Sequence, residues 1–215
     1  MKHNQVRQVV FPIITAMIWG SSFVAQSTST EHVGAYTFNA ARSFVGFLAL
    51  LVVVQIFKML RKEPPAEQTA AEKKAGRRDL ILGGICCGIA LALACNLQQL
   101  GMVAGASAGK TSFITTLYVV LVPIFGLALG RRGSPQLWLS VAIAVCGLYL
   151  LCIGEDFSIA PGDGLLILCA LCFSGHILVV DHFSRLTDCV KMSCLQFATA
   201  AVLCMGVAVF TEPID

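Results

Sequence analysis

The sequence predicts an all-α, polytopic bundle of transmembrane helices, and two observations carry this prediction. Of the 215 residues, 57% are hydrophobic and only 13% are charged, and the mean hydropathy is +0.81. In soluble domains about a quarter of the residues are charged, so the composition excludes an ordinary soluble protein. The apolar residues are also gathered in runs of about 20 residues, the length that an α-helix needs to cross a bilayer.

Seven such runs follow one another along the chain, and each is predicted to span the membrane: 9–26, 35–57, 80–100, 108–129, 135–152, 162–183 and 192–210. The connections between them alternate in charge. Thirteen of the 15 Lys and Arg residues lie before the first run or after the second, fourth and sixth. Short cytoplasmic loops hold the basic residues of membrane proteins. We therefore predict a multi-pass protein of the cell (plasma or inner) membrane with a cytoplasmic amino terminus.

Two segments of the first half recur in the second half at a constant offset. Residues 16–23 align with 170–177, and residues 38–42 align with 192–196 without a gap. Five predicted spans separate the copies, and because this number is odd, the second copy is inverted in the membrane. The prediction is a five-helix repeat at 1–154, with a cytoplasmic linker at about 58–79, and the start of a second repeat, two helices long, at 155–215.

Four motifs resemble those of one transporter family: IWGSSFVAQ at 18–26, FNAAR at 38–42, NLQQ at 96–99 and GKTSFITTLYVVLVP at 109–123. They are similar to the EamA family of the drug/metabolite transporter (DMT) superfamily. The resemblance implies ten helices in two inverted five-helix repeats. This chain lacks the last three helices, so we expect a member truncated after the seventh helix. If the chain ends at Asp215, a second copy or another partner must supply those helices, which makes a homodimer one expected assembly.

Arg42 is the sharpest candidate for substrate binding. It lies about 10 Å into the second span at 1.5 Å per residue, on one helix face with Asn39 and Gly46. Insertion of Arg at the centre of a membrane helix costs roughly 2.5–3.5 kcal/mol, so the residue needs a cavity or a partner. One interpretation is that its planar fork binds the carboxylate or phosphate of an anionic substrate. The alternative is a structural pin that bonds to helix-end carbonyls or reaches the interface.

The remaining candidates are polar or aromatic side chains that share faces of the predicted spans. If these faces converge they line a cavity near the membrane midplane; alternatively the side chains bond neighbouring helices together. Lys110 would attract anions or reach the interface, and His176 would carry protons because imidazole titrates near neutral pH. The candidates besides Arg42 are Trp19, Ser22, Gln26, Asn39, Asn96, Gln99, Lys110, Thr111, Thr115, Tyr118, His176 and Gln196.

Small residues precede the fourth span at a regular interval. Gly101, Gly105 and Gly109 recur every four residues. In one continuous helix they would give a smooth face for a neighbouring helix.

These features together predict a transporter of small metabolites or drugs that works by alternating access around a central polar cavity. The sequence shows no ligand set with metal spacing and no nucleophile–base pair, so we predict no catalytic residue, metal or cofactor. The expected partners are the lipid bilayer and a small-molecule substrate, anionic if Arg42 faces it, and not nucleic acid. The alternatives are a membrane-embedded enzyme and a structural or regulatory membrane protein without transport activity.

Overall fold

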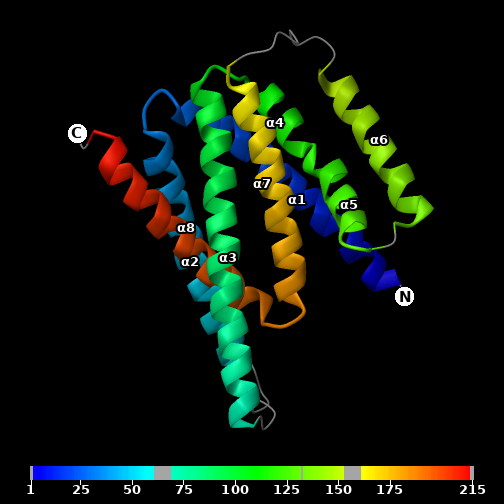
Figure 1. The fold of residues 1–215 in the computed structure, drawn as a ribbon, viewed down its shortest axis with the longest axis vertical. Helices are drawn as coiled ribbons and strands as arrows, with labels where there is room; N and C mark the ends of the chain where they lie inside the picture. The colour runs from blue at the N-terminus through cyan, green and yellow to red at the C-terminus, as the bar shows by residue number, and fades with distance from the viewer. Residues whose placement is uncertain (1, 61–68, 132, 153–160, 214–215) are drawn as a thin grey trace.

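The computed structural model describes residues 2–60, 69–131, 133–152 and 161–213, and all regular secondary structure in these ranges is α-helical, as predicted (Figure 1). The helices are α1 (Lys2–Ser29), α2 (Ala35–Leu60), α3 (Ala70–Val103), α4 (Ala108–Thr116), α5 (Tyr118–Ala128), α6 (Pro135–Cys152), α7 (Asp163–Ser184) and α8 (Cys189–Thr211).

Among the described residues, six helical segments are long and apolar enough to cross a membrane, when α4 and α5 are counted as one segment, Ala108–Ala128. They correspond to six of the seven predicted spans. The fifth predicted span is helix α6, whose bounds match the prediction, but its apolar stretch, Pro135–Gly147, is too short to count among the six. The protein is therefore a multi-pass membrane protein.

The fourth predicted span is not one continuous helix, because it breaks at Leu117 between α4 and α5. Two features of the sequence that weaken a helix lie near this break. Pro123 inside α5 has no N–H to donate, so the turn before it is short of a helical hydrogen bond. The Thr116 hydroxyl donates to the Ser112 carbonyl at 2.6 Å, a bond of the kind that bends helices. The break places a joint in the middle of the span.

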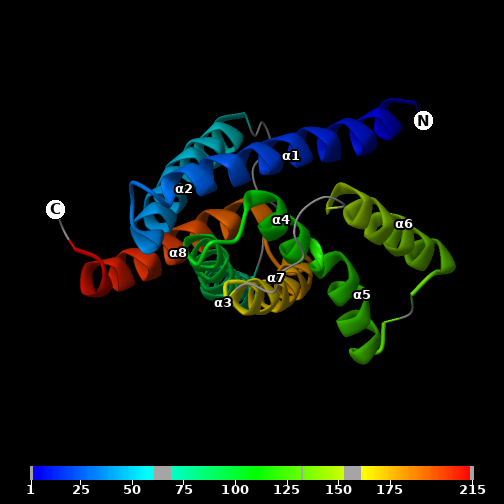
Figure 2. The same cartoon turned by 90° about the horizontal axis from the view of Figure 1, so that it is seen from above.

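Helix α3 packs against both α7 and α8, and α8 packs in turn against α2 (Figures 1 and 2). Glycines let these helices approach closely: a Cβ at Gly83 would overlap Phe183 of α7, and one at Gly84 would overlap Leu195 of α8. Small residues have this role in membrane helix packing. Helix α6 lies outside this group, beside α4 and α5.

Helices α2 and α8 run antiparallel. Tyr36 at the start of α2 contacts Glu212 just after α8, and Gly46 further along α2 faces Phe197. An inverted copy of the second span requires this relative orientation. The repeat itself stays a prediction, and its predicted boundary at 154/155 lies outside the described residues.

Two helices extend into the range predicted as a cytoplasmic linker, about 58–79. Helix α2 continues to Leu60, and α3 begins at Ala70; residues 61–68 lie outside the described ranges. Thr69 starts α3 with a capping box, in which its side chain accepts from the Glu72 amide while the Glu72 carboxylate accepts from the Thr69 amide. This T-x-x-E signal was present in the sequence and was missed.

The three regularly spaced glycines do not share one helix face, so that prediction was wrong. Helix α3 ends at Val103, and Gly105 has a φ of +95°, a left-handed conformation that interrupts the helix. Gly101 makes the close contact expected, because a Cβ there would overlap Leu166 of α7.

Candidate functional site

A cavity of about 300 Å³ lies among α1, α2, α3, the α4–α5 joint, α7 and α8. Its walls therefore come from both of the predicted repeats. The lining residues are Trp19, Ser22, Phe23, Gln26, Arg42, Ser43, Leu91, Cys95, Gln98, Thr115, Thr116, Tyr118, Phe173 and Phe197.

Six of the residues predicted from the sequence line this cavity: Trp19, Ser22, Gln26, Arg42, Thr115 and Tyr118. Trp19, Ser22 and Gln26 come together because spacings of three and four residues fall on one face of a helix. Arg42 lies across the cavity on α2, and the joint between α4 and α5 brings in Thr115 and Tyr118.

Arg42 is the one charged side chain among the described lining residues. It is half-buried, and its guanidinium carbon lies 5.8 Å from the ring centroid of Phe38, one helical turn earlier. No carboxylate contacts it among the ion pairs of the described residues. The guanidinium therefore brings a positive charge to a wall whose other lining side chains are neutral.

Gln26 contributes a buried polar atom to the same cavity. The residue is 2% exposed, and its side-chain Oε1 has no hydrogen-bond partner among the described residues. Its backbone carbonyl is satisfied, because it accepts from Gln99 Nε2 at 3.1 Å. A buried oxygen without a donor is costly.

Aromatic rings form much of the remaining wall. The Tyr118 and Phe173 rings stand 6.3 Å apart at a tilt of 51°, within the range of favourable ring contacts. On the α2 side, a Cβ at Gly46 would lie only 3.1 Å from Phe197 Cδ1. Glycine at position 46 thus leaves room for the Phe197 ring at the cavity edge.

A second hollow, of about 510 Å³, adjoins the first. It is lined by Phe11, Pro12, Thr15 and Ala16 of α1, together with Trp19 and Tyr118. Trp19 and Tyr118 therefore line both hollows. These two rings stand between the central cavity and a groove that follows the amino-terminal half of α1.

The cavity is thus enclosed by bilayer-length helices and lined by one charged side chain among the described residues, that of Arg42. The sequence model of the EamA-like transporter family matches residues 7–153. The chain belongs to this family. The match confirms the resemblance seen in the sequence motifs and the DMT superfamily assignment.

One curated relative is an "Uncharacterized transporter" from Archaeoglobus fulgidus, 28% identical over 199 residues. The aligned region covers 92% of this chain but 56% of the relative, so this EamA-like chain spans about half the length of the relative it matches. No solved structure matches the chain significantly.

The other seven predicted residues do not line the cavity of this EamA-like transporter, and several of them bond helices together. Asn39 of α2 donates to the Cys95 carbonyl at 3.2 Å and to Asn96 Oδ1 at 2.7 Å, both on α3. Asn96 in turn donates to Cys204 Sγ of α8 at 3.3 Å. These bonds hold α2, α3 and α8 together beside the cavity.

Contacts of the same kind involve the remaining candidates. His176 of α7 lies 3.1 Å from Gln196 Oε1 of α8. Lys110 forms an ion pair with Asp163, and Gln99 bonds α3 to α1. These contacts match the alternative interpretation, in which polar side chains bond neighbouring helices together. Thr111 is fully buried, but its hydroxyl has no hydrogen-bond partner among the described residues.

Eight lining residues were not predicted: Phe23, Ser43, Leu91, Cys95, Gln98, Thr116, Phe173 and Phe197. Gln98 carried a usable signal, because a glutamine inside an apolar span needs a partner. Its Nε2 donates to Thr115 Oγ1 at 3.1 Å. The phenylalanines carried none, since an aromatic residue in an apolar run faces lipid, protein or a cavity with equal ease.

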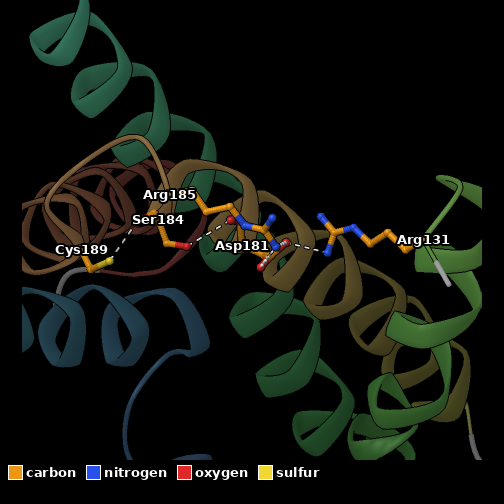
Figure 3. A network of polar contacts seen from close by, with 5 residues as sticks. All are labelled: Arg131, Asp181, Ser184, Arg185 and Cys189. Atoms are coloured by element: carbon orange, nitrogen blue, oxygen red, sulfur yellow. Dashed lines mark hydrogen bonds and ion pairs between the residues drawn. The ribbon is translucent and has the colours of Figure 1, made fainter. Parts of the chain in front are cut away.

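Helix α7 is joined by ion pairs at both ends to the span formed by α4 and α5. At its start, Asp163 lies 2.7 Å from Lys110 Nζ. At its end, Asp181 lies 2.6 Å from Arg131 and 3.1 Å from Arg185 (Figure 3). The first pair is the more buried, with side chains 16% and 13% exposed against 46% and 34% for Arg131 and Asp181.

Proposed function

We propose that this EamA-like protein moves small metabolites or drugs across the cell membrane by alternating access around the central cavity. The observation that carries the proposal is the cavity itself. It places Arg42, Gln26 and Thr115 among bilayer-length helices, where polar groups are costly unless they serve a site or a partner.

The ion pairs at the two ends of α7 supply candidate gates for this mechanism. In alternating access, the route to the cavity is closed on one side while it is open on the other. Separation of Lys110 from Asp163 would free one end of α7, and separation of Arg131 from Asp181 would free the other. The helix break at Leu117 lies between the two pairs, where a hinge is needed.

The charges near each end of the bundle support one orientation of the chain. Lys58 in the last turn of α2 and Arg131 and Arg185 near the end of α7 lie at one end of the bundle; Glu212 and Asp163 lie at the other. With the basic end in the cytoplasm, the amino terminus is cytoplasmic, and the Lys110–Asp163 pair is the outer gate.

This orientation also assigns a state to the structure. The outer ion pair is the more buried of the two, whereas the groove along α1 adjoins the cavity on the side of the amino-terminal half of that helix. We therefore assign an inward-facing conformation, in which Trp19 and Tyr118 stand between the cavity and the cytoplasmic groove.

The test is flux across a sealed membrane. The 215-residue chain would be reconstituted in liposomes loaded in turn with labelled organic acids, amino acids, amines and sugars. We expect efflux of at least one class above that of protein-free liposomes, with saturation at high concentration. Chemical turnover without flux would support the enzyme alternative, and neither turnover nor flux would support a structural or regulatory role.

A further inference from the structure

We propose that the cavity selects a small aromatic monocarboxylate, with the carboxylate held by Arg42 and the ring held among the aromatic side chains. This inference rests on the proposed function, because it takes the cavity to be the substrate site. It goes further by excluding organic cations and by ranking zwitterionic amino acids below simple acids.

The first step concerns charge. Arg42 lines the cavity, and no acidic residue is found among the described lining residues. A charge in a low-dielectric site is stable only when it is compensated. A monoanion would pair with Arg42 and bring the net charge of the site to zero. An organic cation would add a second positive charge.

The second step concerns the other cations near the transport route. Lys110 lies 2.7 Å from Asp163, and Arg131 and Arg185 share Asp181. Asp163 offsets the charge of Lys110, and Asp181 offsets one of the two arginine charges at the other end of α7. None of these three cations lines the cavity. Anion binding in the cavity therefore depends on Arg42, whose planar guanidinium can give two parallel hydrogen bonds to a carboxylate.

The third step concerns the body of the ligand. Five aromatic side chains line the cavity: Trp19, Phe23, Tyr118, Phe173 and Phe197. Aromatic rings prefer tilted or offset contacts with one another, and Tyr118 and Phe173 already show such a contact. The volume of about 300 Å³ lies at the lower limit of small-molecule sites, about 300–1,000 Å³. It suits one ring with a short chain.

The fourth step concerns the ammonium group of an amino acid. Gln26, Ser43 and Gln98 line the cavity with neutral polar side chains, and a neutral polar group does not compensate a full charge. An aromatic amino acid would therefore bind less tightly than the corresponding acid.

Three probes that share a ring and a two-carbon chain test this ranking: 3-phenylpropionate, phenylalanine and 2-phenylethylamine. Binding to the purified full chain would be followed by the fluorescence of Trp19, after Trp138→Phe removes the other of the two tryptophans; Trp138 lies on α6 and does not line the cavity. We expect 3-phenylpropionate to bind about tenfold more tightly than phenylalanine and at least a hundredfold more tightly than the amine. Tighter binding of phenylalanine or of the amine would overturn the proposal.

Variants at position 42 test whether Arg42 causes the preference for the acid. Arg42→Gln should weaken 3-phenylpropionate at least tenfold and leave its neutral amide, 3-phenylpropanamide, within twofold. Arg42→Lys keeps the charge without the fork and should recover part of the loss. The amide is the folding control, and unchanged acid binding in Arg42→Gln would refute the role of Arg42.

The two proposals fail in different ways. If 3-phenylpropionate binds but does not cross liposome membranes, the binding site stands and transport fails. If amines or sugars cross while the acid neither binds nor crosses, transport stands and the substrate class is wrong.

Discussion

The carboxylate of Glu212, just after α8, caps the start of α2 through Thr37. Oε2 accepts from the Thr37 hydroxyl at 2.6 Å and from the Thr37 amide at 2.9 Å, while Oε1 accepts from the Tyr36 amide at 2.8 Å. A negative group at a helix amino terminus satisfies free N–H groups and the helix dipole. This contact ties the end of α8 to the start of α2, far apart in the sequence.

The cap predicts a pH dependence of stability. Burial alone raises the pKa of the Glu212 carboxyl, but the bonds from the Thr37 side chain and from the Tyr36 and Thr37 amides outweigh burial and hold the pKa below its ordinary value of 4.5. Because the folded pKa is the lower one, the stabilisation is complete above the unfolded pKa and is lost as the pH falls through the folded pKa.

Glu212→Gln should therefore lower stability at neutral pH by about 1 kcal/mol, the typical value of a helix cap, and should differ less from the native chain in acid. Thermal unfolding in detergent, followed by circular dichroism at neutral and at acid pH, measures both effects. Glu31→Gln, an exposed residue of the preceding loop, is the control. Equal losses at both pH values would show that the charge of Glu212 is not the cause.

Gly34 is predicted to be required by this cap. A Cβ at position 34 would overlap the Glu212 carboxylate, so Gly34→Ala must displace the cap and should cost about as much as its loss, about 1 kcal/mol. In a Glu212→Ala background the same substitution should cost little, which gives a coupling of at least about 0.5 kcal/mol in a double-mutant cycle. Additive losses would mean that Gly34 is needed for another reason.

The sequence predicted the helices well, because composition and span length depend on the solvent alone. It predicted contacts between helices less well. Asn39 and Arg42 are three residues apart and share a predicted face, yet Asn39 bonds to α3 whereas Arg42 lines the cavity. Which of the two side chains bonds to another helix depends on which helix packs beside it. The sequence alone does not show which helix that is.

The break at Leu117 shows a second limit. Apolar residues run on through positions 117–129, so the periodicity favoured one helix. Pro123 and Thr116 were visible as weak points, but membrane helices tolerate both where neighbours satisfy the backbone. Tyr118 was still predicted, because it lies three residues after Thr115 and shares its helix face. Thr116, which also lines the cavity beside the break, was not predicted.

The outer ion pair predicts a shift in access to the cavity. Asp163→Asn leaves Lys110, whose side chain is 16% exposed, without its carboxylate. The free-energy cost of losing this ion pair lies between that of losing an exposed pair and that of losing a buried one. The outer end of α7 should therefore open more often. We expect the half-buried Cys95 of the cavity to react about tenfold faster with an impermeant thiol reagent from outside, a shift of about 1.4 kcal/mol.

Two comparisons make this experiment decisive. Lys191→Gln removes the exposed pair with Asp188, whose side chains are 52% and 51% exposed, and should change the rate less than twofold. Exchange of the two charges, with Lys110→Asp and Asp163→Lys together, should restore the slow rate. An unchanged rate in Asp163→Asn would exclude this pair as a gate.

The opposite end of α7 should respond differently, because Asp181 has two partners. Arg131 contacts Oδ2 at 2.6 Å and Arg185 contacts Oδ1 at 3.1 Å (Figure 3). Arg185 directly follows α7, the helix that carries Asp181, whereas Arg131 follows α5, so only the Arg131 contact joins the two spans. Arg131→Gln should therefore raise labelling of Cys95 from the cytoplasmic side, while Arg185→Gln should change it less than twofold.

The pair is solvent-exposed and worth at most about 1 kcal/mol, so the Arg131→Gln increase should be about three- to fivefold and should shrink at high salt. Equal effects of the two substitutions would mean that Asp181 acts by its charge alone and not as a tie between α5 and α7.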